Sequence, residues 1–179
     1  MVAHSAPLPD WLVALEARAP DLVASFAELA EDRLLAVRRN LRTRAGEGSV
    51  ARLLPQHAAI ADSYAAHLDA LPDAALSQSG GEAGWTVAQT LGHAFAARSG
   101  LVTAASLAAQ GRFPVDAPAV VPGVPGPPDA SRDVLRKRLA ASQRLVERAA
   151  RAVAGHETEP CPLEHPLVGR LRCGEWFLF

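Results

Sequence analysis

The stretch from Gly84 to Leu101 constrains the fold of this chain more than any other. It reads GWTVAQTLGHAFAARSGL and is almost entirely apolar. Thr86 and Gln89 have the spacing of a capping box, in which the Thr hydroxyl and the Gln amide each satisfy a backbone N–H at a helix start. Gly111 is a natural residue for the other end. We therefore predict a long buried helix from Thr86 to about Gln110.

The rest of the chain also has the composition and spacing of helices. Its 179 residues suit one domain, and they are rich in Ala, Leu, Arg and Glu, which lose little rotamer freedom in a helix. Apolar residues at helical spacing, with Asp21, Ser49 and Ser131 as caps, predict further helices over residues 10–18, 21–45, 49–71 and 131–154. We expect an all-α fold without strands: residues 1–47 form a helical arm, and residues 48–179 form a four-helix bundle whose last helix is incomplete.

A proline-rich segment separates two of the predicted core helices. Residues 112–131 contain six prolines, which remove backbone donors and fix φ, so we expect an irregular connection. A connection of this length can cross between helices that are not antiparallel neighbours. Long irregular connections also often cover ligand pockets. We therefore predict a long crossover between the second and third core helices.

The overall charge, the first residues and the apolar stretch argue against nucleic acid and membranes as partners. Lys and Arg number 18 against 19 Asp and Glu, so the chain carries no excess charge that would attract nucleic acid or an anionic membrane. The first residues lack the pattern of a secretory signal. The one long apolar stretch carries His93 and Arg98 and is better explained as a buried helix. We expect a cytoplasmic protein with neither nucleic acid nor membrane as a partner.

Cations are concentrated on the predicted helix over residues 131–154. Such a face could bind an anionic ligand, but no aromatic residues accompany it to stack on bases. We interpret it as a solvated helix face. Its cations are Arg132, Arg136, Lys137, Arg138, Arg144, Arg148 and Arg151, set against Asp133 and Glu147.

His93 lies on a stripe of small residues within the first helix described above. At 100° per residue, His93 shares its side of the helix with Ala96, Ala97, Gly100 and Ala104. Small side chains leave room either for a neighbouring helix or for a cavity. Two interpretations therefore remain open: a packed core histidine, or a metal ligand that is completed by residues from facing helices.

Other residues of types that bind metal ions are spaced less favourably for a shared site. Cys161, His165 and Cys173 form C-x3-H-x7-C, which contains zinc-ligand types, but prolines interrupt the pattern. Small buried cysteines with a turn histidine are the alternative. His57 and His67 are about 80° out of alignment on one helix and cannot both face one ion well. His57 falls within an apolar stripe, where we expect a position at the edge of the core.

Two stretches together resemble the DinB-like superfamily of four-helix proteins. GWTVAQTLGHAFAA resembles that family's tryptophan-then-Ser/Thr helix start, which is followed by a histidine. HPLVGRLRCGEWFLF is similar to the family's HP-x-x-G-x-L-x-x-x-E-W approach to its last helix. The resemblance covers residues from about 50 to 179.

The resemblance implies a bundle that usually dimerises and often holds a divalent metal such as nickel or zinc. The ligands are one histidine of the second helix and an H-x-x-x-H pair on the last. Related enzymes are transferases and isomerases that use low-molecular-weight thiols such as mycothiol or bacillithiol, whose thiolate the metal would stabilise. His93 carries over as the first ligand. The pair would come about eight and twelve residues after Glu175, beyond Phe179, so we expect a fragment or a degenerate form with an incomplete triad.

These considerations leave two expectations for function. One is a metal-dependent thiol S-transferase or isomerase that acts on a small-molecule substrate, inactive in the chain as given. The other is a non-catalytic helical bundle that acts through dimerisation or through binding of a partner. In both, His93 is the residue on which a site would depend.

Overall fold

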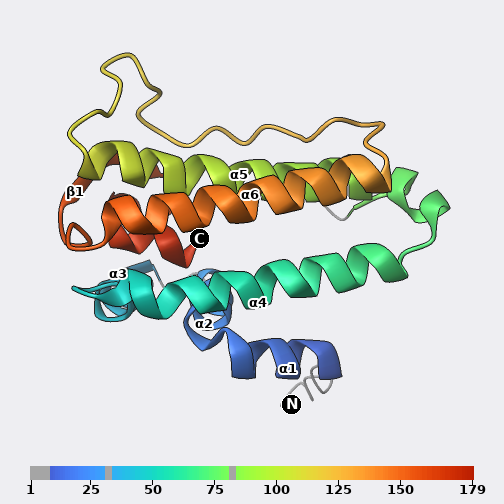
Figure 1. Ribbon diagram of the computed structural model, residues 1–179, viewed down its shortest axis with the longest axis horizontal. Helices are drawn as coiled ribbons and strands as arrows, with labels where there is room; N and C mark the ends of the chain where they lie inside the picture. The colour runs from blue at the N-terminus through green and yellow to red at the C-terminus, as the bar shows by residue number, and fades with distance from the viewer. Residues whose placement is uncertain (1–8, 31–33, 81–83) are drawn as a thin grey trace, which may run out of the picture.

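The computed structural model describes residues 9–30, 34–80 and 84–179, and most of them are helical (Figure 1). The remaining residues lie outside the described part. The side chains of residues 28–35 also lie outside it, including those of Leu29 and Leu34, which belong to the apolar spacing predicted over residues 21–45. The elements are α1 (Asp10–Arg18), α2 (Pro20–Ala30), α3 (Leu34–Arg44), α4 (Ser49–Ala70), η1 (Asp73–Ser77), α5 (Val87–Ala109), α6 (Arg132–Val153), β1 (Pro160–His165), β2 (Gly169–Arg172) and η2 (Gly174–Leu178). None of the described helices is both long and apolar enough to cross a membrane.

The predicted ends of α5 and the predicted start of α6 are confirmed. In the capping box of α5, Gln89 N–H donates to Thr86 Oγ1 at 3.2 Å, and Thr86 N–H donates to Gln89 Oε1 at 3.0 Å. Gly111, just beyond α5, has φ +64°. Ser131 caps α6 through its hydroxyl. Local side-chain chemistry therefore fixed these boundaries.

Four predictions near the N-terminus are wrong. The run over 21–45 is two helices, α2 and α3. α2 begins at Pro20, so Asp21 lies within its first turn and is not its cap. The cap of α4 is Gly48, at φ +73°, and Ser49 is already the first helical residue, with a buried hydroxyl that has no partner. The left-handed backbone at Gly48 changes the chain direction in a way that favours glycine. Phe26, one of the apolar residues at helical spacing that predicted the helix over 21–45, is 77% exposed.

The expectation of a chain without strands is also wrong. β1 and β2 pair antiparallel, with His165 opposite Gly169 at the turn, and the segment after Arg172 is the short 3-10 helix η2. Cys161, Leu163 and Leu171 are buried between exposed or partly exposed neighbours. That alternation identifies a strand face, but it extends over too few residues to stand out between prolines.

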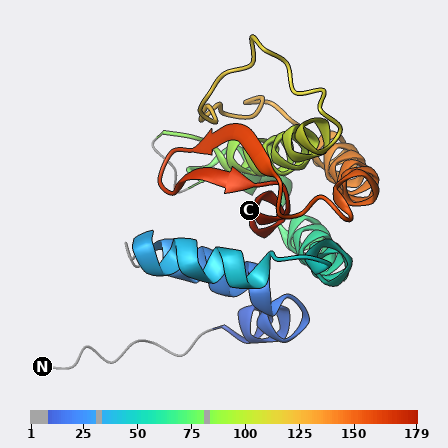
Figure 2. The ribbon, with the colours of Figure 1, turned by 90° about the vertical axis from the view of Figure 1, so that its left-hand side faces the viewer.

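Three long helices form the body of the protein. α5 and α6 pack along each other and run in the same direction, while α4 runs the opposite way (Figure 1). Because α5 and α6 are parallel, the proline-rich connector returns along the whole of α5. η2 contacts both α4 and α5, and it places the C-terminus between them (Figure 2). A fourth long helix is not among the described residues.

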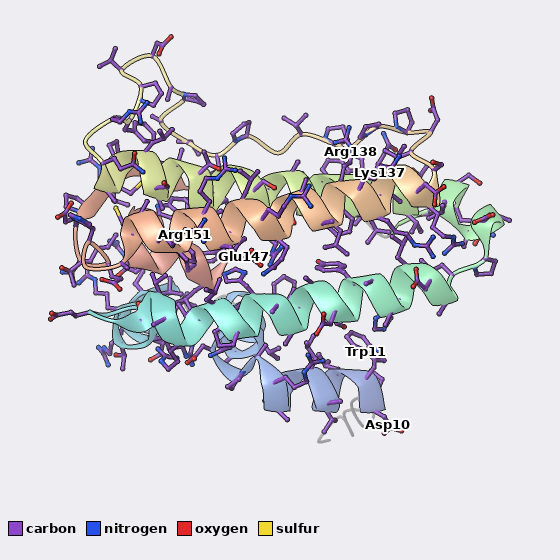
Figure 3. All side chains as sticks on the ribbon, viewed as in Figure 1. Asp10, Trp11, Lys137, Arg138, Glu147 and Arg151 are labelled. Atoms are coloured by element: carbon purple, nitrogen blue, oxygen red, sulfur yellow. The ribbon has the colours of Figure 1, made fainter. Side chains whose placement is uncertain are left out.

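The N-terminal helices share the core of the long ones. Leu41 of α3 belongs to the same buried cluster as Leu53 of α4 and Phe177 of η2. Asp21 is bound by Gln56, whose Nε2 donates to its carboxylate at 2.6 Å. Trp11 lies between α1 and α4, with its ring 4.7 Å from that of His67 (Figure 3). The arm is therefore packed against α4 and is not a separate body.

The connector is fixed on the rest of the protein at two places. At one, the backbone of Gly126 passes over α5 close to the backbone of Gly92. The N–H of Gly126 donates to the carbonyl of Gln89 at 3.0 Å. At the other, the N–H of Val121 and the carbonyl of Ala119 bond to the backbone of Glu164 in β1. The hairpin thus holds one part of the connector, and the glycine crossing holds the other.

The glycine crossing makes a prediction about stability. A Cβ at Gly126 would lie 2.7 Å from the Gln89 carbonyl and 2.8 Å from Gly92 Cα, so we expect Gly126→Ala to cost about 1–3 kcal/mol of unfolding free energy. Gly100→Ala is the matched variant, since its Cβ would meet nothing within 4 Å and a helix interior favours alanine by roughly 1 kcal/mol. Urea denaturation measures both. Wild-type stability of Gly126→Ala would show that the connector is not held at this crossing.

Candidate functional site

A groove runs between α5 and the connector. It has a volume of about 680 Å³. Its floor is the small-residue side of α5, and its roof is the proline-rich chain, with β1 at one side. The groove is lined by His93, Ala96, Ala97, Ser99, Gly100, Leu101, Thr103, Ala104, Leu107, Phe113, Pro114, Ala117, Pro118, Val121, Pro122, Val124 and Leu163. The small residues therefore border a cavity and do not pack against another helix there.

His93 lies where the connector meets the first turns of α5. Its Nδ1 is 2.7 Å from the carbonyl oxygen of Val124. A carbonyl can only accept, so Nδ1 carries the proton, and the neutral ring has its lone pair on Nε2. The ring of Trp85 lies 5.0 Å away. His93 is thus held in one orientation and one tautomer, with Nε2 as an acceptor.

The side chains around His93 do not complete the metal triad that the family resemblance implies. Among residues 9–30, 34–80 and 84–179, no three His, Cys, Asp or Glu side chains are grouped to hold a metal. The Nδ1 bond to Val124 is the kind of contact that orients metal-ligating histidines. One imidazole does not make a site, however, so the described residues do not fit the implied metal as a complete set.

The Cys161, His165 and Cys173 set does not form a metal site either. Both thiols are buried, and burial raises the pKa of Cys173 to about 12 and also raises that of Cys161. His165 uses Nδ1 to accept the N–H groups of Leu167 and Val168, and its ring stacks on Phe179 at 4.6 Å. The residues are therefore two core thiols and a turn histidine.

The sequence analysis did not predict the buried polar network around Arg98. Arg98 is almost fully buried and donates to Ser142 Oγ at 2.8 Å, to the His57 carbonyl at 2.9 Å and to Gln143 Oε1 at 2.5 Å. Desolvation lowers its pKa to about 10, so it stays charged. These bonds join α4, α5 and α6. A lone arginine in an apolar helix was the available signal, since a buried guanidinium requires partners.

His57 lies in the same interior, away from the groove. Its Nε2 is 2.9 Å from the Phe177 carbonyl, so the neutral ring donates there, and Nδ1 is buried without a partner. Burial, with the nearby Arg98 charge, lowers the pKa of His57 to about 3. His67 is exposed on the same helix, where its Nδ1 lies 2.8 Å from the Ser63 carbonyl. Neither histidine lines the groove with His93.

The cations of α6 have two different surroundings. Arg132 donates to the carbonyls of Leu68 and Leu71 at the end of α4, and Arg136 pairs with Asp69 at 2.7 Å. The others are exposed, and some of them are labelled in Figure 3. These five are Lys137, Arg138, Arg144, Arg148 and Arg151, and Arg136 is exposed as well. No cation of α6 lines the groove.

The His57 environment makes a prediction about pH. The pKa of His57 is about 3 in the folded protein against 6.5 as the ordinary value, so the unfolded chain binds the extra proton first. Its contribution to stability is complete above pH 6.5 and is lost as the pH falls toward 3, by up to roughly 1.4 kcal/mol per pH unit. Urea denaturation from pH 7.5 to 5 should show a weaker loss in His57→Gln. Parallel losses in the two proteins would contradict this assignment.

The comparison with known families agrees with the resemblance noted from the sequence. Residues 56–179, which span α4 from its second turn through η2, match the family model described as the DinB superfamily. No similar curated protein and no similar solved structure was found. The match covers more than half of the chain and includes both motifs that carry the resemblance. This chain therefore belongs to the DinB superfamily.

Proposed function

We propose that this protein binds a small apolar molecule in the groove between α5 and the connector. The observation that supports this proposal is a roofed cavity of about 680 Å³ whose lining, all within the described residues, includes no Asp, Glu, Lys or Arg. Pockets of this size with mostly apolar walls and few polar groups are typical of small-molecule sites. Burial of apolar ligand surface would supply most of the binding free energy.

His93 is the residue we assign to orient the ligand. Because Nδ1 bonds to Val124, Nε2 is the ring nitrogen left to accept a hydrogen bond from a hydroxyl or similar donor of the ligand. Because Val124 belongs to the roof, His93 also joins floor and roof. The groove is thus formed before the ligand arrives, which reduces the entropy cost of binding.

A metal-dependent thiol transferase or isomerase is the second candidate. The orientation of His93 suits a nickel or zinc ligand, and a low-molecular-weight thiol with a second substrate would then use this groove. This role requires ligands beyond His93, which the described residues do not supply. Metal analysis separates the candidates: one equivalent of metal in the purified protein, lost in His93→Ala, would favour the enzyme. Homodimerisation, which the family resemblance implies, remains a further proposal.

Filling the groove should abolish ligand binding. Nile red, an uncharged dye that fluoresces in apolar surroundings, serves as the test ligand. We expect Gly100→Phe to weaken its binding about tenfold or more, because a Cβ at Gly100 meets nothing within 4 Å and the ring would occupy the groove. Ala140→Phe, at an exposed position of α6, is the matched control and should bind like wild type. Equal dye binding by both variants would place the dye elsewhere and overturn the proposal.

A further inference from the structure

The groove is long compared with its volume. Its lining on α5 extends from His93 to Leu107, which corresponds to about 21 Å along a helix. A volume of about 680 Å³ spread over that length makes the groove narrow, and this narrow groove, which is open on its outer side, is called the channel below. A compact ring system would fill only part of it and would leave the remaining walls uncovered.

The walls of the channel suit a chain without polar groups. Three of the seven connector residues in the lining are Pro114, Pro118 and Pro122, which have no N–H and so place no unpaired donor above an apolar ligand. Ser99, on the floor side, donates its hydroxyl to the Phe95 carbonyl at 2.7 Å. A charged group along the channel would lose its hydration with no charged partner in return.

The channel differs at its two ends. His93 lies at one end, with its Nδ1 bonded to the Val124 carbonyl, so Nε2 is the ring nitrogen left to accept a hydrogen bond from a ligand. The lining at the other end is apolar and includes Leu107, Phe113 and Leu163. A molecule with one hydrogen-bond donor and a long apolar tail matches both ends.

We propose that the groove takes a single unbranched aliphatic chain, with a terminal hydroxyl at His93 and its tail toward Leu107 and Leu163. This inference rests on the proposed small-molecule function and names the class of ligand. Its basis is the combination of a charge-free channel, a roof held at the Gly126 crossing and on β1, and one oriented acceptor at a single end.

Displacement of Nile red by straight-chain primary alcohols tests the proposal. Each added methylene should tighten binding about fourfold until the tail extends beyond the apolar lining at Leu107, after which the affinity should level off. Cyclic alcohols with the same number of carbons should bind at least about tenfold more weakly, since a compact ring covers less of the length of the groove. Dye binding without dependence on chain length would overturn the chain proposal and leave the small-molecule function. Absence of dye binding would overturn both.

Two variants test the direction of the chain. Gly100→Phe is titrated directly with each alcohol by calorimetry, because it weakens dye binding. Its affinity should level off at a shorter alcohol, because the ring blocks the channel midway, while Ala140→Phe should match wild type. In His93→Phe, alcohols should lose their advantage over the corresponding methyl ethers, and the dependence on chain length should remain. An unchanged preference for alcohols in His93→Phe would overturn the placement of the hydroxyl. Thermal melts confirm that each variant is folded.

The source of the chain is tested with phosphatidylcholine vesicles. We expect no displacement of the dye by vesicles, because their charged headgroup and paired tails do not fit a single charge-free channel. Displacement by vesicles and not by free alcohols would overturn the proposal in favour of a lipid surface.

Discussion

The contact between Gly126 and Gly92 is the constraint on which the candidate site depends. Two backbones approach so closely there that a Cβ on Gly126 would lie 2.8 Å from Gly92 Cα. This approach, with the bond from Gly126 N–H to Gln89, holds the connector at one end of α5. The bridge to Glu164 holds it again beside β1. With these two points held, the connector from Phe113 to Val124 lies over the small side chains of α5, and the groove is the space that remains.

A second constraint holds the long helices in register below that groove. Arg98 donates to partners on α4 and α6, and Gln143, one of those partners, in turn donates to Glu147. A buried charge is costly unless its hydrogen bonds are made, so this network favours one arrangement of the helices over others. Because α5 carries both Arg98 and the floor of the groove, the network also fixes the position of the floor.

The parts of the fold that depend on local chemistry could be predicted from the sequence. The Thr86 capping box, the glycine after α5 and the irregular proline segment follow from neighbouring residues alone, as does the small-residue face around His93. The Gly48 cap was missed because Ser49 offered a common alternative one residue later. The hairpin was missed because its buried alternation covers a few residues among prolines.

The site itself could be predicted only in part, because its roof comes from a distant segment. His93 was identified from its spacing, but its tautomer depends on Val124, about thirty residues away. No periodicity indicates where an irregular segment will lie. The glycines of the connector, Gly123 and Gly126, were the available signal, since a glycine between prolines permits close approach to another backbone.

The most direct test of a roofed apolar site on α5 is an NMR measurement on protein with ¹³C-labelled alanine methyl groups. Intermolecular NOEs from the tail of a bound straight-chain alcohol should reach the methyl groups of Ala97 and Ala104 on the floor and of Ala117 in the roof. NOEs confined to Ala61 and Ala65 of α4 would place the ligand between the long helices and would contradict the account.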